Sequence, residues 1–283
     1  LFDSGCVPRA FLKTQFNQGG SVKIAPCSAL IALFLLTAPA VFAATDSETI
    51  TIYDVKVVES RPYDRGRFTQ GLLIDSGKLW VSSGLYGKSF LERIDWPSGK
   101  NKKRLKLSDS LFAEGLAMHK GELFLLTWKS QQMLVVDPQT LEVKDRYPIP
   151  GEGWGITSDG ERLWLSDGTS RIREWREGSF GRSFAVTFGS KSLPRLNELE
   201  WIDGEIWANV WLTDQIVTIA PTSGRITSII DLTNLLPKRE RASNTDVLNG
   251  IALDPETGGI WVTGKRWPTM YRIELVKRHT VKR

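Results

Sequence analysis

The feature that most constrains the fold is an internal repeat of about 44 residues. Five apolar segments each carry an aromatic residue just after a turn: "GKLWVSSG", "GELFLLTW", "ERLWLSDG", "GEIWANVW" and "GGIWVTGK". The aromatic residues Trp80, Phe124, Trp164, Trp207 and Trp261 are spaced 44, 40, 43 and 54 residues apart. Another strand-like segment precedes each one, and one or two follow it, separated by turn sequences such as "PSGK" and "PTSG". Four-stranded units that recur every 40–45 residues are typical of a β-propeller.

We therefore predict an all-β fold, a five-bladed β-propeller of four-stranded antiparallel blades, as a single domain over residues 44–283. No helical period of comparable strength appears, which argues against an α/β fold. The alternating segment at 50–64 is predicted to supply the outer strand of the last blade and so to close the ring. The insertion at 231–246 is predicted to be a surface loop or a short helix.

The chain carries a formal net charge of +5, with its basic residues spread along the sequence. The one dense basic run, "SGKNKKRLKLS" at 98–108, lies between two strand-like segments. We interpret it as a solvated hairpin tip rather than as a site for a polyanion. No nucleic-acid partner is expected.

Residues 1–43 differ from the repeat. From Val22, which we interpret as a non-standard start, the sequence runs through one lysine and an apolar core to a small-residue end at Ala43. These are the parts of a secretory signal peptide, with residues 1–21 upstream of it. An uncleaved membrane anchor is the alternative. We expect the signal to span about 22–43, and the mature chain to be exported, periplasmic or secreted, without stable membrane association.

Composition limits the chemistry of the mature chain. Both cysteines, Cys6 and Cys27, fall before residue 44, so no disulfide is expected there. The only histidines are His119 and His279, which nearly excludes histidine-rich zinc sites and a Ser-His-Asp triad. His119 ends an apolar strand beside a turn, and we predict a surface position for it.

The repeat also predicts where a site would assemble. The innermost strand of each propeller blade faces the central channel, so the segments that begin these strands gather at one mouth. They place different side chains at equivalent positions: Phe68 and Gln70, Phe112 and Glu114, Trp154, Asn197 with Glu198 and Glu200, and Asn249. Equivalent positions that differ in chemistry are where a site can be grafted onto a repeating fold.

Glu114 is the sharpest candidate at this mouth, since it stands between an aromatic residue and a glycine in "LFAEGLA". A carboxyl beside aromatic rings loses solvation and its pKa rises, which suits general acid/base work near neutral pH. The structural alternative is that Glu114 accepts hydrogen bonds from loop amides or indole donors. Trp128, Trp211 and Lys265 each lie four positions after a strand aromatic and would add two aromatic walls and a cation to the mouth. Trp267 is a further candidate nearby.

Eight motifs, in this order, resemble the plant and bacterial type of glutaminyl-peptide cyclotransferase (glutaminyl cyclase): "FTQGL", "LYGKS", "FAEGLA", "LLTWK", "GEGWGIT", "LNELEWIDGEIWANVW", "LNGIALDP" and "VTGKRWP". The likeness runs from about Gln70 to Leu275. This family is a five-bladed propeller and is unrelated to the zinc-dependent animal type.

The resemblance implies an acyltransferase that converts the N-terminal glutamine of peptides and proteins to pyroglutamate and releases ammonia. The α-amine attacks the γ-amide of the same residue, with Glu114 as the proton shuttle and Lys265 and Asn197 as further catalytic candidates. The resemblance assigns glutaminyl binding to six side chains: Phe68, Gln70, Phe112, Trp128, Trp154 and Trp211. We expect no metal ligand and no required cofactor; a structural cation is compatible but not predicted. The enzyme is expected to act as a monomer.

Other functions remain open at this stage. A non-catalytic propeller would bind a peptide or a sugar through the same mouth. A lactonase would need a calcium cage, which Glu114, Asn197 and Asn249 could begin. A glycosidase would need a second carboxyl opposite Glu114, from Glu198 or Glu200.

Overall fold

A computed structural model of the protein describes residues 49–282. These residues lie in the second of the two compact units into which the chain divides, Asp46–Arg283. The predicted signal peptide and the sequence before it fall outside the described residues. Within residues 49–282, no helix is long and apolar enough to cross a membrane.

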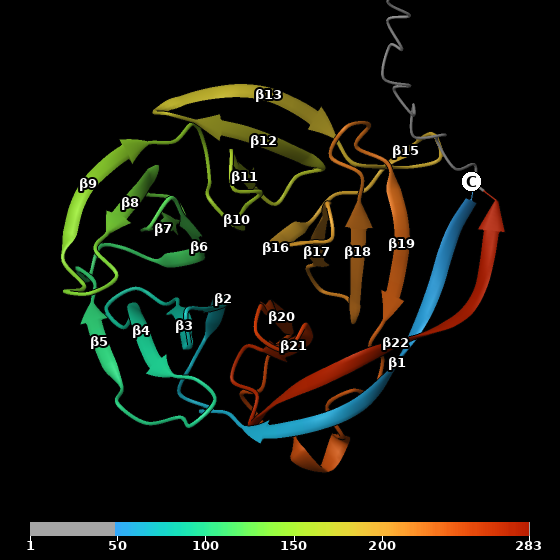
Figure 1. The fold of residues 1–283 in the computed structure, drawn as a ribbon, viewed down its shortest axis with the longest axis horizontal. Helices are drawn as coiled ribbons and strands as arrows, with labels where there is room; N and C mark the ends of the chain where they lie inside the picture. Colours follow the sequence, from blue (N-terminus) through green and yellow to red (C-terminus); the bar gives the residue numbers. More distant parts are fainter. Residues whose placement is uncertain (1–48, 283) are drawn as a thin grey trace, which may run out of the picture. The chain divides into compact units, whose positions relative to one another are not determined.

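Three four-stranded antiparallel sheets lie between residues 69 and 185, and in each the strands follow in sequence order (Figure 1). The first sheet contains β2 (Thr69–Asp75), β3 (Lys78–Ser83), β4 (Phe90–Asp95) and β5 (Lys103–Lys106). The second contains β6 (Ala113–His119), β7 (Glu122–Thr127), β8 (Gln132–Val136) and β9 (Val143–Pro148). The third contains β10 (Ile156–Ser158), β11 (Leu163–Ser166), β12 (Arg171–Arg176) and β13 (Ser179–Ala185).

The remaining long strands form one eight-stranded sheet in the order β16-β17-β18-β19-β1-β22-β21-β20. Its strands are β16 (Leu196–Ile202), β17 (Glu205–Val210), β18 (Gln215–Ile219), β19 (Ile226–Asp231), β1 (Thr49–Pro62), β22 (Thr269–Lys282), β21 (Gly259–Gly264) and β20 (Leu248–Asp254). β1 pairs antiparallel with β22 along its length and parallel with β19 at 51–54. The prediction that this N-terminal strand lies outside the last strands of the chain is confirmed, because β1 follows β20, β21 and β22 in the sheet order.

Two small elements complete the described chain. β14 (Thr187–Phe188) and β15 (Lys191–Ser192) form a two-stranded ribbon. The 3₁₀ helix η1 (Lys238–Glu240) has no buried residue and lies in the insertion between β19 and β20, as predicted.

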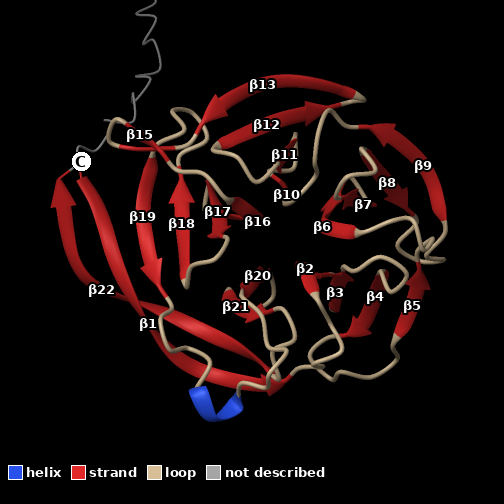
Figure 2. Ribbon diagram, turned by 180° about the vertical axis from the view of Figure 1, so that it is seen from behind, coloured by secondary structure: helices blue, strands red, loops and turns tan. Residues whose placement is uncertain are grey.

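The innermost strands follow one another around a central axis (Figure 2). β2 contacts β6, β6 contacts β10, β10 contacts β16, β16 contacts β20, and β20 contacts β2. The prediction of an all-β fold with four-stranded antiparallel sheets is confirmed. The strands expected to form the fourth and fifth blades share one hydrogen-bonded sheet.

Burial decreases from the inside of each sheet to its edge. In β7 every residue after the first is buried, because both faces pack against neighbouring sheets, whereas β5 is almost wholly exposed. The interpretation of 98–108 as a hairpin tip is therefore wrong for residues 103–106, which form an edge strand. Its lysines discourage pairing with other chains.

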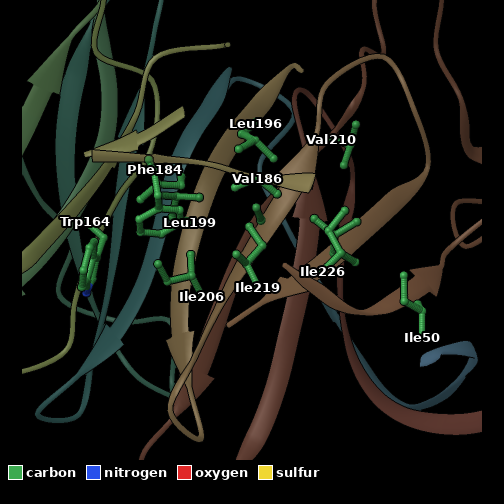
Figure 3. Close-up of a cluster of buried hydrophobic side chains, with 13 residues drawn as sticks. Ile50, Trp164, Phe184, Val186, Leu196, Leu199, Ile206, Val210, Ile219 and Ile226 are labelled. Atoms are coloured by element: carbon green, nitrogen blue, oxygen red, sulfur yellow. The ribbon is translucent and has the colours of Figure 1, made fainter. Parts of the chain in front are cut away.

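The core lies between neighbouring sheets rather than around a single centre. Figure 3 shows one cluster, in which Trp164 and Phe184 of the third sheet face Leu199 and Ile206 of the eight-stranded sheet. Ile50 of β1 joins the same cluster. Burying each large apolar side chain stabilises the fold by about 1.5–3 kcal/mol, so these contacts hold neighbouring sheets at a fixed distance.

Candidate active site

A pocket of about 390 Å³ lies where the inner strands β2, β6 and β16 begin. All nine residues predicted for the site line it: Phe68, Gln70, Phe112, Glu114, Trp128, Trp154, Asn197, Trp211 and Lys265. Leu85, Leu212 and Asp246 also line the pocket and were not predicted. The structure therefore brings together side chains from every predicted repeat.

Three polar pocket residues, Gln70, Glu114 and Asn197, lie at irregularities of the inner strands. The pairing register shifts at Gln70 in β2, Glu114 in β6 and Asn197 in β16, and Asn249 occupies the same place in β20. Extra residues of this kind bend a strand and turn a side chain out of the regular alternation. The repeated irregularity explains how equivalent residues of different repeats reach one mouth.

Glycine follows Gln70 and Glu114 because the inner strands approach each other closely there. A β-carbon on Gly71 would lie 2.7 Å from the backbone nitrogen of Leu116. One on Gly115 would lie 2.7 Å from the carbonyl oxygen of Trp154. Contacts this short do not occur, so only glycine permits the approach. The repeated polar–glycine pair thus combines a close-packing requirement with a variable functional side chain.

A second set of equivalent positions follows the second strand of each sheet. Trp128 comes directly after β7, Trp211 after β17 and Lys265 after β21. They lie at strand ends rather than within strands, and all three line the pocket.

The other two repeats carry glycine at this position, and the space is taken by a ring from elsewhere. A β-carbon on Gly84 would lie 2.2 Å from the Phe112 ring, and one on Gly168 would lie 2.5 Å from the Trp154 ring. These glycines are therefore what lets Phe112 and Trp154 reach the pocket.

The aromatic walls pack edge to face. The ring centroids of Phe112 and Trp128 are 5.4 Å apart, as are those of Trp154 and Trp211. Phe68 lies 6.3 Å from Phe112. Such arrangements are favoured by the ring quadrupole and add to the rigidity of the walls.

One carboxylate holds two of the tryptophans. The indole nitrogens of Trp128 and Trp154 donate to the same oxygen of Glu152, at 2.7 and 2.9 Å. The Lys129 ammonium lies 3.9 Å from the other Glu152 oxygen and 4.1 Å from the centroid of the Trp128 ring. No sequence pattern indicated this role for Glu152. The residue lies in the connection between β9 and β10, has no counterpart in the other repeats, and contacts Trp128 in a different connection.

Glu114 and Lys265 are the ionisable groups buried in the pocket, 4% and 5% exposed. The side-chain amide of Gln70 donates to the Glu114 carboxyl at 3.1 Å. Burial raises the pKa of Glu114 well above its usual value, against the opposing charge of Lys265. Burial lowers the pKa of Lys265, against the carboxylates of Glu114 and Asp246. The Lys265 ammonium also lies 5.0 Å from the centroid of the Phe68 ring.

Asn197 has a side-chain oxygen that is buried without a hydrogen-bond partner within residues 49–282. A buried polar atom left in this state costs free energy unless something else satisfies it. Asn197 therefore offers a free acceptor in the pocket.

Glu198 and Glu200 do not line the pocket. Glu198 accepts hydrogen bonds from the backbone nitrogens of Leu72 and Ile251, and Glu200 from that of Leu253. Burial raises the pKa of Glu198 well above its usual value and that of Glu200 to about 8. These carboxyls link inner strands, so the glycosidase reading that paired one of them with Glu114 is wrong.

Two further predictions are corrected. His119 is buried rather than at the surface: its Nδ1 lies 2.8 Å from the Ser158 hydroxyl, and its ring packs edge-on against Phe124. Trp267 is buried outside the pocket, where its indole donates to the carbonyl oxygen of Asp246 at 3.0 Å. In the part of the chain that the structure describes, no group of three or more His, Cys, Asp or Glu side chains is placed to hold a metal ion.

Fold and site together define an all-β protein whose inner strands assemble an aromatic pocket around a buried carboxyl and a buried amine. The chain belongs to the glutamine cyclotransferase family, whose sequence model matches residues 29–275. It is 36% identical over 230 residues to a glutaminyl-peptide cyclotransferase of Arabidopsis thaliana, an alignment that covers 79% of this chain and 72% of that one. The crystal structure of Myxococcus xanthus glutaminyl cyclase is similar, with a TM-score of 0.73 and 27% identity over 81% of this chain and 100% of that chain. The predicted family is confirmed.

Proposed function

We propose that the protein is a glutaminyl-peptide cyclotransferase that converts an N-terminal glutamine to pyroglutamate and releases ammonia. The observation that carries this proposal is the Glu114 carboxyl, buried beside Lys265 in an aromatic pocket and hydrogen-bonded to Gln70. Family membership and the named relatives support the same activity.

The reaction needs two proton transfers at one place. The neutral α-amine attacks the γ-amide carbon of its own residue, and its typical pKa of about 7.7–8.0 makes the neutral form accessible. As the new C–N bond forms, the Glu114 carboxylate accepts a proton from the amine. The protonated Glu114 then donates to the amide nitrogen, the old C–N bond breaks, and ammonia leaves. A raised pKa suits this double role, because the group must both accept and donate near neutral pH.

Lys265 and Asn197 are proposed to act on the reacting amide. Negative charge develops on the amide oxygen during attack, and a buried ammonium such as that of Lys265 stabilises it. Preorganised donors at such a position are worth about 2.7–4 kcal/mol. The free Asn197 oxygen offers an acceptor for a substrate N–H group. Gln70 is proposed to orient the glutaminyl group while it holds Glu114.

The aromatic walls supply the geometry of attack. The glutaminyl side chain must fold back so that its amide carbon meets its own amine, and this near-attack shape is favoured by confinement. Phe68, Phe112 and Trp211 are proposed to enclose the side chain. Trp128 and Trp154 complete the enclosure, held in place by Glu152.

We also propose that the fold is a five-bladed β-propeller. The closed cycle of contacts among β2, β6, β10, β16 and β20 supports five inner strands around one axis. The eight-stranded sheet divides naturally where β1 meets β19, since this is a parallel pairing at the outer edge of two antiparallel groups.

Three further features remain proposals. The reaction is an intramolecular substitution in which the substrate supplies both nucleophile and leaving group. The enzyme has only to position them and to transfer protons, which supports an enzyme without a cofactor. Export, to the periplasm or beyond, rests on the signal-like sequence at 22–43. A monomer is proposed and is tested by light scattering in solution.

The test of the proposed function is ammonia release from a short peptide that begins with glutamine. Protein beginning near Ala44 is assayed with and without excess chelator, and a peptide with an acetylated α-amine serves as the control. We expect release from the free peptide alone, in both buffers. Loss of activity in the chelator would contradict a cofactor-free enzyme, and no release by folded protein would contradict the proposed function.

A further inference from the structure

A second groove, of about 320 Å³, adjoins the pocket and shares Leu212 and Asp246 with it. One wall is the turn after β17, from Leu212 to Asp214. The other wall is formed by the last part of the insertion between β19 and β20 and by the first residue of β20; its lining residues are Arg241, Thr245, Asp246, Val247 and Leu248. The insertion therefore has a structural role at the site, because it forms one side of an extension of the pocket.

Leu212 lies at the shared edge, in a turn. Its φ is 66°, in the left-handed region, and its side chain is 53% exposed. This backbone conformation is shared by other turn residues of the chain. At Leu212 it leaves an exposed apolar side chain at the junction between pocket and groove.

Hydrogen bonds hold the insertion wall of the groove against the rest of the protein, including the pocket residue Lys265. The Arg65 guanidinium donates to the carbonyl oxygen of Glu240 at 2.6 Å. The backbone nitrogen of Asp246 donates to the carbonyl oxygen of Lys265 at 3.0 Å, and the Trp267 indole donates to the carbonyl oxygen of Asp246 at 3.0 Å. The groove is therefore preformed and fixed relative to Lys265.

We propose that this groove binds the residues that follow the N-terminal glutamine of the substrate, and that it favours a basic side chain among them. The proposal rests on the proposed function. Cyclisation uses only the first residue, so the rest of a peptide must leave the pocket across its edge. The shared residues Leu212 and Asp246 make the groove a continuous path for it.

The preference for a basic side chain follows from the charged residues that line the groove. Asp246 stands at the shared edge, and Asp214, half-buried, stands two residues beyond Leu212. Asp214 has no ion-pair partner within residues 49–282, and neither has Arg241, which lines the groove but not the pocket. The groove therefore carries two carboxylates against one guanidinium, with Asp246 at the edge it shares with the pocket, and this net negative charge attracts a lysine or arginine at the second or third position of the peptide. Interactions of this kind weaken at high salt.

The test compares four substrates by kcat/KM for ammonia release: glutamine amide, and tetrapeptides that begin Gln-Ala, Gln-Lys and Gln-Glu. For the wild type at low salt we expect Gln-Lys to exceed Gln-Glu by about 3- to 10-fold, a range typical of one or two partly solvated charge contacts. We expect 0.5 M salt, about a 4–5 Å screening length, to reduce this ratio toward one. Equal values for the three tetrapeptides would overturn the preference.

A charge reversal then assigns the preference to the groove. Asp214→Lys is expected to invert the Gln-Lys to Gln-Glu ratio and to leave glutamine amide unchanged, since Asp214 does not line the pocket. The matched control is Glu256→Lys, the same charge change at an exposed turn at the other end of β20, which should leave every ratio unchanged.

The outcomes separate the two proposals. Turnover of Gln-Ala with a ratio that Asp214→Lys does not move would overturn the groove alone. Failure of folded wild-type protein to release ammonia from any of the four substrates would overturn the proposed function itself.

Discussion

Gln70 donates a hydrogen bond to Glu114 at 3.1 Å across 44 residues of sequence, the length of one repeat. The two side chains occupy the same place in neighbouring inner strands, and each is followed by a glycine: Gly71 lets β2 approach β6, and Gly115 lets β6 approach the start of β10. One repeat therefore supplies an amide, and the next supplies the carboxyl that the amide holds. A repeating fold has produced an asymmetric pair from equivalent positions.

Gln70→Ala should shift the pH dependence of activity. The amide N–H favours the ionised form of Glu114, so its loss raises the pKa of that carboxyl further. If Glu114 acts as the base, the acidic limb of the kcat/KM profile should move upward by about one pH unit. An unmoved limb, with folding intact by circular dichroism, would contradict the coupling between Gln70 and Glu114.

Glu152→Ala should weaken substrate binding more than turnover. The change frees the indoles of Trp128 and Trp154, which then sample other orientations. We expect KM for a Gln-initiated peptide to rise several-fold, with a smaller change in kcat. Glu152→Gln keeps an acceptor oxygen and should restore much of the loss. Equal damage by the two variants would argue that Glu152 acts through its charge instead.

Gly84→Ala should displace the Phe112 ring, because the new methyl group would lie 2.2 Å from it. Overpacking of this kind costs about 1–3 kcal/mol, and the displaced ring should also raise KM. Gly181→Ala in β13 is the matched control, since its methyl group would meet only the Glu174 side chain at ordinary contact distance. Thermal unfolding and peptide kinetics of both variants provide the measurement. Equal effects at the two sites would contradict the role given to Gly84.

Glu200 should make the protein less stable as the pH rises. Its pKa is about 8 in the folded chain because of burial, against a usual value of 4.5. The folded state therefore holds a proton that the unfolded state has lost between these values, so stability falls as pH rises from about 4.5 to 8. Glu200→Gln should reduce the dependence of the unfolding free energy on pH over this range, measured by urea denaturation at several pH values; the remaining slope belongs to the other buried carboxyls, Glu114 and Glu198. An unchanged slope would contradict the contribution of Glu200.

The sequence predicted the fold well because the repeat is periodic in the residues that pack. Trp80 and its four equivalents are all buried, and each lies on the second strand of its repeat. The outermost strands carried a weaker signal: β5 is an exposed basic edge, and its sequence resembles a turn. The β1–β19 pairing, which joins two four-stranded groups into one sheet, could not be predicted from the repeat either, because it occurs once and not in every unit.

The pocket was predictable for the same reason, since Glu114 and its neighbours occupy equivalent positions of the repeat. Residues that join the site through connecting segments were missed. Glu152 reaches the tryptophans from outside the strands, and Asp246 and Leu212 belong to an insertion and to a turn. Contacts between segments of this kind depend on how the sheets are placed in space, which local sequence patterns do not encode.

The most direct test of the account is the activity of Glu114→Gln on a Gln-initiated peptide. The substitution keeps the size of the side chain and an oxygen acceptor, so folding and thermal stability should stay close to those of the wild type. Loss of a proton shuttle should lower kcat about 10²–10⁴-fold, with KM little changed. A folded Glu114→Gln variant that releases ammonia at the wild-type rate would contradict Glu114 as the general acid and base.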